Sequence, residues 1–79
     1  MNNSVKEVKA LENNYLKLAF SDGKQKIFDV SPYLNLPVFK PLKNNTLFKS
    51  VKIEFDTVSW PNEIDFDPAF LYENGKDIL

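Results

Sequence analysis

Two segments of alternating residues flank the turn signal Asp22-Gly23, and this feature constrains the fold of the chain more than any other. Within segments 16–20 and 28–30, every second residue is a large apolar one, as in a half-buried β-hairpin. These residues are Leu16, Leu18, Phe20, Phe28 and Val30. For the apolar side chains of both strands to lie on one face of the hairpin, even-numbered residues of the first strand must pair with even-numbered residues of the second. A three-residue loop permits this pairing and a two-residue loop does not. The pattern therefore predicts the loop Ser21-Asp22-Gly23, with Gly23 in a left-handed conformation.

A second, tighter hairpin is predicted further along the chain. Residues 51–55 alternate strictly, with apolar residues at odd positions and charged residues at even ones, which is typical of a half-buried strand. Asp56-Thr57 is expected to turn the chain, and segment 58–60 continues as a strand. Pro61 ends the pairing because proline has no N–H to donate. Segment 5–11 is expected to be a further strand, in which a change of apolar parity indicates a bulge or an edge position.

The segment between the hairpins is predicted to contain little regular structure. Ser31 is a capping residue followed by proline, so residues 31–34 are expected to form a single helical turn. Pro37 before segment 38–42 and Pro41 within it favour an extended connection there. Residues 45–49 are expected to form a short helix, with Asn44 or Asn45 as its N-cap.

The last helix is predicted from the dipeptide Asp67-Pro68, in which a capping residue precedes a proline at the first helical position. Phe66 and Leu71 occupy the positions of a hydrophobic staple. The helix 68–73 is expected to end where Asn74-Gly75 supplies a left-handed stop. Because a helix of two turns is unstable alone, it must dock its apolar side chains onto the sheet.

These elements predict a small α+β fold: an antiparallel β-sheet of two hairpins plus an N-terminal strand, with two short helices. A chain of 79 residues is too short for a second independently folded unit, so residues 1–79 are expected to form a single domain. The sequence contains neither the apolar stretch of a signal peptide nor one long enough to span a membrane. We therefore expect a cytoplasmic protein.

The residue types in the sequence exclude several kinds of chemistry. Cysteine and histidine are both missing, which excludes disulfides, thiolate zinc sites and imidazole bases. Glu63, Asp65 and Asp67 alternate along the chain and could bind a hard cation through their carboxylate oxygens, as in a metal-dependent enzyme. Asp67 is better explained as the cap of the last helix. We therefore expect no enzymatic activity, no cofactor and no metal.

Charge is divided unevenly along the chain. Residues 1–52 hold nine lysines against four acidic residues, whereas residues 53–79 hold one lysine against seven acidic residues. Such a division can orient a partner or a self-association, but a solvated surface formed when the two halves fold together is the more common explanation. The lysines and the aromatic residues between them could also bind single-stranded nucleic acid. The residues concerned are Lys6, Lys9, Lys17, Lys24, Lys26, Lys40, Lys43, Lys49, Lys52, Tyr15, Phe28, Tyr33 and Phe39. Phe28 falls on the apolar face of its strand, so a nucleic-acid-binding accessory domain is the less favoured alternative.

The tripeptide Trp60-Pro61-Asn62 is the strongest candidate for a partner-binding site. A tryptophan that closes a strand beside a proline is a rigid amphipathic anchor, and such groups are enriched in binding hot spots. For the indole itself, packing in the core of the domain against Phe55, Phe66 or Phe70 is the favoured interpretation. The predicted partner-binding residues are Trp60, Pro61, Asn62 and Asp65.

Five spaced blocks of the sequence have a recognisable order. They are Lys26–Leu34, Phe39–Leu42, Val51–Asn62, Asp65–Pro68 and Leu71-Tyr72. In this order they resemble the bacterial domain of unknown function 2442 family over nearly the whole chain. The residues that match the family pattern individually are Trp60, Pro61, Asn62, Asp65, Asp67 and Pro68. The family usually has a glycine after Trp-Pro-Asn, whereas Glu63 stands there in this chain.

The resemblance implies a small α+β domain for which no biochemical activity is established. It also implies a gene that lies beside the gene of another small protein, in an arrangement similar to a toxin and antitoxin pair. We therefore expect a non-enzymatic protein-interaction domain, antitoxin-like, whose protein partner is encoded by the neighbouring gene. Formation of a homo-oligomer is compatible with the modest core of so short a chain.

Overall fold

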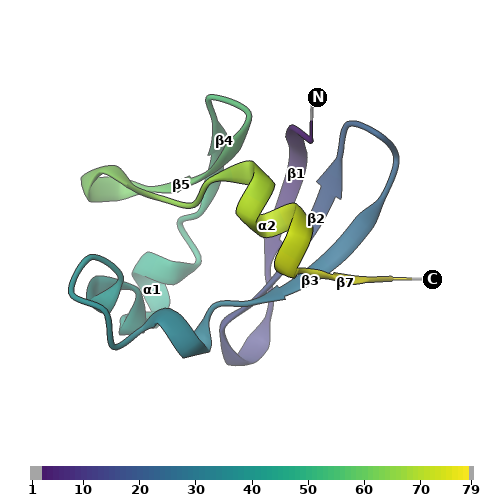
Figure 1. The fold of residues 1–79 in the computed structure, drawn as a ribbon. Helices are drawn as coiled ribbons and strands as arrows, with labels where there is room; N and C mark the ends of the chain where they lie inside the picture. The colour runs from purple at the N-terminus through teal and green to yellow at the C-terminus, as the bar shows by residue number, and fades with distance from the viewer. Residues whose placement is uncertain (1–2, 79) are drawn as a thin grey trace.

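The computed structural model describes residues 3–78, whose strands form two antiparallel sheets (Figure 1). The larger sheet has the order β1-β2-β3-β7 and the smaller has the order β4-β5-β6. The strands are β1 (Val5–Ala10), β2 (Tyr15–Phe20), β3 (Gln25–Asp29), β4 (Lys52–Glu54), β5 (Thr57–Trp60), β6 (Ile64–Asp65) and β7 (Lys76–Asp77). The helices are α1 (Asn45–Phe48) and α2 (Pro68–Asn74), with 3-10 turns η1 (Glu12–Asn14), η2 (Ser31–Tyr33), η3 (Lys40–Lys43) and η4 (Pro61–Glu63). The α+β fold class is confirmed, and its strands divide between two sheets.

The β2–β3 hairpin has the loop predicted from parity. The N–H of Phe20 donates to the carbonyl of Lys24 at 2.9 Å, so the loop consists of Ser21-Asp22-Gly23. Gly23 is left-handed, with a φ of +91°. On the other side of β2, the pairing with β1 shifts register between Val5 and Glu7, which is the predicted bulge.

The β4–β5 hairpin is also present, but its turn lies one residue earlier than predicted. Glu54 pairs with Thr57, so the turn residues are Phe55 and Asp56. Their φ angles are +55° and +67°. Two consecutive left-handed residues match the twist of the flanking strands, as in a type I′ turn. Phe55 therefore lies at the hairpin tip and is 90% exposed, whereas the alternation predicted it on the same face as the half-buried Ile53.

Two predictions for the connection between β3 and β4 are wrong. Ser31 does not cap the first turn, because its hydroxyl instead donates to Asp29 Oδ1 at 2.7 Å. Residues 38–42 are not extended, since they enter η3 through a hydrogen bond from the N–H of Leu42 to the carbonyl of Phe39. The fixed φ of proline suits a 3-10 turn as well as an extended chain.

The short helix α1 is confirmed together with its cap. Asn44 is the N-cap, and its Oδ1 accepts a hydrogen bond from the N–H of Leu47 at 3.0 Å. This bond satisfies one of the N–H groups that have no partner inside the first helical turn.

Helix α2 begins as predicted but ends differently. Asp67 Oδ1 accepts from the N–H of Ala69 at 3.3 Å, and Leu71 is fully buried. The predicted left-handed stop is wrong, because Gly75 has a φ of −77°. A Cβ at Gly75 would lie 2.9 Å from the carbonyl oxygen of Leu71 and 3.1 Å from Cβ of Lys26. Glycine is needed here because the helix end approaches β3 closely.

The buried apolar side chains of both sheets and the helices pack into one core. They are Val5, Leu16, Leu18, Phe20, Phe28, Val30, Leu34, Leu42, Phe48, Val58, Trp60, Ile64, Phe66 and Leu71. In Figure 1, α2 crosses between the smaller sheet and the larger one. No helix within residues 3–78 has the length and apolar character needed to cross a membrane.

Candidate interaction site

Trp60 belongs to the core. Its side chain is 1% exposed, and its indole N–H donates to the carbonyl oxygen of Phe48 at 2.8 Å. The ring stacks on Phe48, with centroids 6.0 Å apart, and meets the edge of Phe66 at 6.1 Å. Burial of a satisfied indole is what the core-packing alternative predicted, so the Trp60 ring is not available for surface contact in this structure.

The residues that follow Trp60 are on the surface. Pro61 and Asn62 lie in η4, which joins β5 to β6, and Asp65 lies on the edge strand β6 opposite Ser59. These three of the four predicted partner-binding residues are exposed. The structure thus presents Pro61, Asn62 and Asp65 at one end of the small sheet, and their role in partner binding stays a prediction.

The three alternating carboxylates are solvated and separate in role. Glu63 is the last residue of η4, Asp65 belongs to β6 and pairs with β5, and Asp67 caps α2. No group of three His, Cys, Asp or Glu side chains between residues 3 and 78 has the geometry to hold a metal ion. Asp67 acts as the helix cap that the sequence predicted.

An aromatic surface that the sequence did not predict lies around Phe66. Phe39 stacks face to face on Phe66 with centroids 4.5 Å apart, and Phe70 is nearly parallel to it at 6.1 Å. Tyr33 contacts the edges of both Phe66 and Phe70, at 5.7 and 5.6 Å. Phe66 is buried, whereas Tyr33, Phe39 and Phe70 are each partly exposed. Four rings from three separate segments therefore form a continuous, partly solvated cluster.

The turn between η2 and η3, which joins Tyr33 to Phe39 along the chain, carries two further exposed apolar side chains. Leu36 is 48% exposed and Val38 is 56% exposed. The turn is held to its neighbours by main-chain hydrogen bonds from Leu36 to Tyr33 at 3.0 Å and from Phe39 to Leu36 at 2.9 Å. We call Tyr33, Leu36, Val38, Phe39, Phe66 and Phe70 together the aromatic surface.

The signal for this surface was present in the sequence as the run Leu34-Asn35-Leu36-Pro37-Val38-Phe39. Such an apolar run with a proline has neither the period of a strand nor that of a helix, so it does not indicate which side chains are buried. The structure separates the run into buried Leu34, half-buried Phe39 and four exposed residues, of which Leu36 and Val38 are large and apolar. Exposed aliphatic and aromatic groups that gather in one place mark interaction sites more often than scattered ones do.

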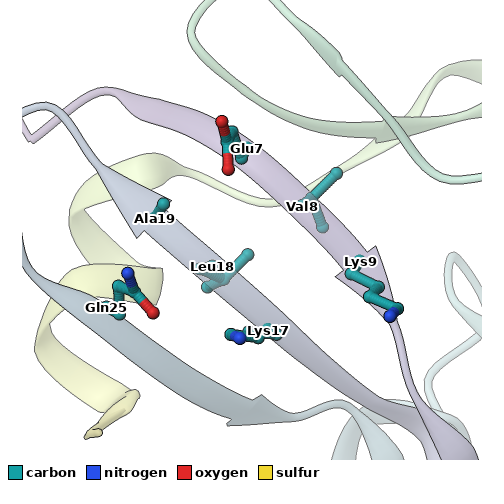
Figure 2. A pocket seen from close by; sticks show the side chains of 7 residues that line it. All are labelled: Glu7, Val8, Lys9, Lys17, Leu18, Ala19 and Gln25. Carbon is teal, nitrogen blue, oxygen red and sulfur yellow. The ribbon is translucent and has the colours of Figure 1, made fainter. Parts of the chain in front are cut away.

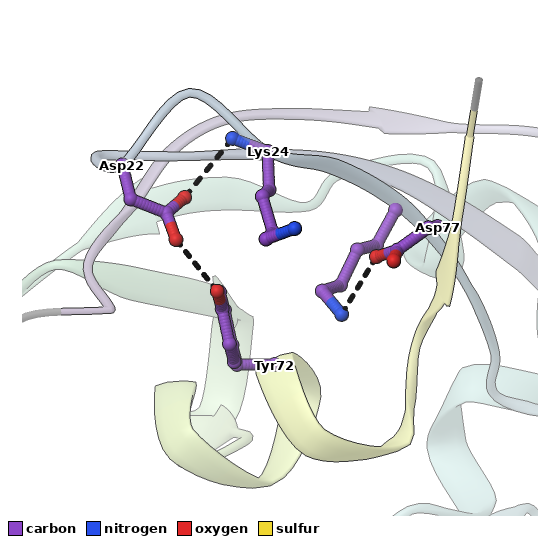
Figure 3. Close-up of polar contacts among 5 residues, drawn as sticks. Asp22, Lys24, Tyr72 and Asp77 are labelled. Carbon is purple, nitrogen blue, oxygen red and sulfur yellow. Dashed lines mark hydrogen bonds and ion pairs between the residues drawn. The ribbon is translucent and has the colours of Figure 1, made fainter.

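A polar cluster ties the C-terminal elements to the β2–β3 hairpin (Figure 3). The Tyr72 hydroxyl donates to Asp22 Oδ2 at 2.6 Å, and the N–H of Lys24 donates to Asp22 Oδ1 at 2.9 Å. Lys26 Nζ lies 2.9 Å from Asp77 Oδ1 and 4.5 Å from the centre of the Tyr72 ring. The cluster joins the loop, α2 and β7.

These contacts also shift the ionisation of the groups that make them. The hydrogen bond from Tyr72, followed by that from the N–H of Lys24, lowers the pKa of Asp22 below its ordinary 3.8. The same hydrogen bond raises the pKa of Tyr72 above its ordinary 10.0. The hydrogen bond from the Lys26 ammonium lowers the pKa of Asp77. Each polar group in the cluster is bonded to another member of the cluster. We therefore interpret the cluster as a structural contact that holds these elements together.

A shallow hollow of about 180 Å³ lies over the strands β1, β2 and β3 (Figure 2). It is lined by Glu7, Val8, Lys9, Lys17, Leu18, Ala19 and Gln25. The side chain of Ala19 is shorter than those of its neighbours, so the surface of the sheet is lower at this position than around it. The hollow contains two of the lysines proposed for nucleic-acid contact, whereas Phe28 from the same set is buried in the core.

Comparison with known proteins gives a single match. No curated protein sequence and no solved structure matches the chain. A family model described as "Protein of unknown function (DUF2442)" matches residues 5–77, which is nearly the whole chain and includes both sheets, α2 and the aromatic surface. The chain therefore belongs to the DUF2442 family, in agreement with the resemblance of its sequence blocks.

Proposed function

We propose that this chain is a non-enzymatic protein-interaction domain that acts in the cytoplasm and binds its protein partner through the aromatic surface. The observation that carries the proposal is the exposure of Leu36 and Val38 beside three partly exposed rings. A domain with so small a core gains stability by burying apolar side chains, so leaving these in water has a cost that a partner would offset. Rings and aliphatic groups that lose contact with water together are typical of binding hot spots.

The partner that we propose is the product of the neighbouring gene, with this chain as the antitoxin-like member of the pair. This part of the proposal rests on the gene arrangement that the family resemblance implies. Pro61, Asn62 and Asp65, which are exposed on the smaller sheet, are retained as further contact residues.

Binding of nucleic acid is the weaker proposal. Of the residues that the sequence grouped for it, Phe28 is buried and Lys26 is engaged by Asp77. The remaining lysines are spread over both sheets and the connection between them. Of the rings in the same set, Tyr33 and Phe39 pack in the aromatic surface, and only Tyr15 is classed as exposed, on β2. A shift of single-stranded DNA or RNA that weakens steeply with salt would support this proposal over protein binding.

The experiment that tests the proposed function is co-expression of the tagged chain with the neighbouring gene product, followed by copurification. We expect a complex from the wild-type chain and none from the double variant Leu36→Ser, Val38→Ser. Tyr15→Ser is the matched control, because Tyr15 is an exposed ring on β2 outside the aromatic surface.

Two results would contradict the proposal. If the wild-type chain elutes alone, the neighbouring product is not its partner. If both serine variants bind as well as the wild type, the aromatic surface is not the contact. The antitoxin-like role has its own test, because deletion of this gene alone should make the neighbouring product harmful to the cell.

A further inference from the structure

The tip of the β4–β5 hairpin carries an aromatic ring in an unfavourable backbone conformation. Phe55 has a φ of +55° and is 90% exposed, so its side chain gains almost no packing in the isolated chain. The left-handed region normally takes glycine, asparagine or aspartate, and a bulky residue there is an outlier. Such outliers gather at sites of function, where the strained group is presented to a ligand or partner.

The tip is rigid and acidic. The carbonyl oxygen of Asp56 accepts a hydrogen bond from the N–H of Val5 at 2.9 Å, which fixes the tip against the start of β1. Glu54 and Asp56 flank the ring, and both are exposed. Neither carboxylate forms an ion pair with any residue that the structure describes. The backbone of the tip is thus held in place, and the residues on either side of Phe55 in the sequence carry unpaired negative charges.

The hollow over β1, β2 and β3 has two lysines at one end and Glu7 at the other. Lys9 and Lys17 stand directly opposite each other on the two strands, and like charges in that position are mutually repulsive. Both are exposed, and within residues 3–78 neither forms an ion pair. Figure 2 shows the two lysines at one end of the hollow, with Ala19 between Glu7 and Gln25 at the other end. An acidic group placed between the lysines would relieve their repulsion.

We propose that the hairpin tip of one copy of this chain docks into the hollow of a second copy. In this contact the Phe55 ring covers Ala19, and Glu54 and Asp56 face Lys9 and Lys17. The two surfaces are complementary in charge at the lysine end of the hollow, where Lys9 and Lys17 would meet the acidic residues on either side of the ring. Glu7 lies opposite Ala19 at the other end, so only the ring is placed there. This self-association uses a surface different from the aromatic surface, so it extends the proposed function without depending on it.

The test is sedimentation equilibrium of the full chain over rising protein concentration at low and at high salt. The contact is small, so we expect association at high concentration only, and we expect salt to weaken it by screening the charges. Phe55→Asn is the decisive variant, since asparagine tolerates the left-handed conformation and the fold is retained. We expect this variant to raise the dissociation constant more than about tenfold.

Charge reversal adds a second arm. The double variant Lys9→Glu, Lys17→Glu should not associate with itself, and neither should Glu54→Lys, whereas a mixture of the two should regain association through the reversed pair. Leu36→Ser is the matched control, because Leu36 is exposed on the aromatic surface. A wild-type chain that stays monomeric at every concentration overturns the proposal, and so does loss of association in Leu36→Ser with retention in Phe55→Asn.

Discussion

Replacing Glu63 by glycine should stabilise the domain, because Glu63 occupies a conformation that glycine adopts more easily. Its φ is +60°, and it follows Asn62 with a φ of +70°. The Glu63 side chain is exposed, and its carboxylate makes no hydrogen bond or ion pair to any residue that the structure describes. Little is therefore lost when the side chain is removed. The family pattern that the sequence resembles usually has glycine after Trp-Pro-Asn, at the position that Glu63 occupies in this chain.

The expected gain in the free energy of unfolding is the difference between two opposing contributions. A left-handed conformation costs a residue with a Cβ about 1–2 kcal/mol relative to the right-handed one. Glycine gives back about 0.4–1 kcal/mol of this through the greater conformational entropy of the unfolded chain. The net gain for Glu63→Gly is then about 0.5–1 kcal/mol, which corresponds to a rise of roughly 2–8 °C in Tm for a domain of this size.

Thermal and urea denaturation followed by circular dichroism would measure this change. Asn62→Gly is one control, and it should leave Tm nearly unchanged because asparagine tolerates the left-handed region. Glu73→Gly is the other, and it should lower the free energy of unfolding by about 1 kcal/mol because Glu73 is an exposed residue inside α2. If Glu63→Gly is neutral or destabilising while both controls behave as expected, the reasoning from backbone strain is refuted.

Three further predictions follow from the core, the end of α2 and the polar cluster. Trp60→Phe should cost about 2–3 kcal/mol, measured by urea denaturation, because it leaves a buried carbonyl unpaired and opens space in the core. Gly75→Ala should cost about 1–3 kcal/mol by the same assay, because its Cβ would meet a carbonyl oxygen at 2.9 Å. The lowered pKa values of Asp22 and Asp77 contribute stability that is present above the ordinary value of 3.8 and lost as pH falls through the lowered values. The raised pKa of Tyr72 contributes stability that is present below 10.0 and lost as pH rises through the raised value, so Tm measured against pH should fall at both ends.

The parts of the fold that could be predicted from the sequence are those with a repeating pattern or a local capping rule. The loop Ser21-Asp22-Gly23 follows from parity alone, and the N-caps of both helices follow from single side chains. Strands β6 and β7 have two residues each, which is too short for a period to appear. Whether hairpins join one sheet or two depends on contacts between distant segments, and no local pattern encodes those contacts.

The candidate site was harder to predict for a different reason. Sequence reasoning kept Trp60 among the candidate contact residues because tryptophan is enriched in binding sites, although it favoured burial of the indole in the core. The structure shows that the indole is buried and hydrogen-bonded. The exposed apolar residues lie instead in an irregular turn, where nothing in the residue types distinguishes Leu36 from the buried Leu34. Exposure of an apolar residue is a property of the packed chain, and it becomes visible only when the neighbours that cover or fail to cover it are known.

Among residues 3–78, pairs of consecutive left-handed residues occur in three turns. Comparing them distinguishes strain that only shapes a turn from strain that presents a side chain. In the turn that joins β1 and β2, Asn13 and Asn14 both suit the conformation. In η4 only Glu63 fits poorly, and its flexible, solvated side chain has no fixed direction from which a partner would benefit. Phe55 fits worst of all, yet its ring is rigid and projects from a tip that is anchored to β1. Relief of strain should therefore be without functional cost at Glu63, whereas at Phe55 the same relief should remove self-association. If Glu63→Gly and Phe55→Asn both raise the free energy of unfolding, and only Phe55→Asn abolishes self-association, then Phe55 is the position where strain is retained for binding.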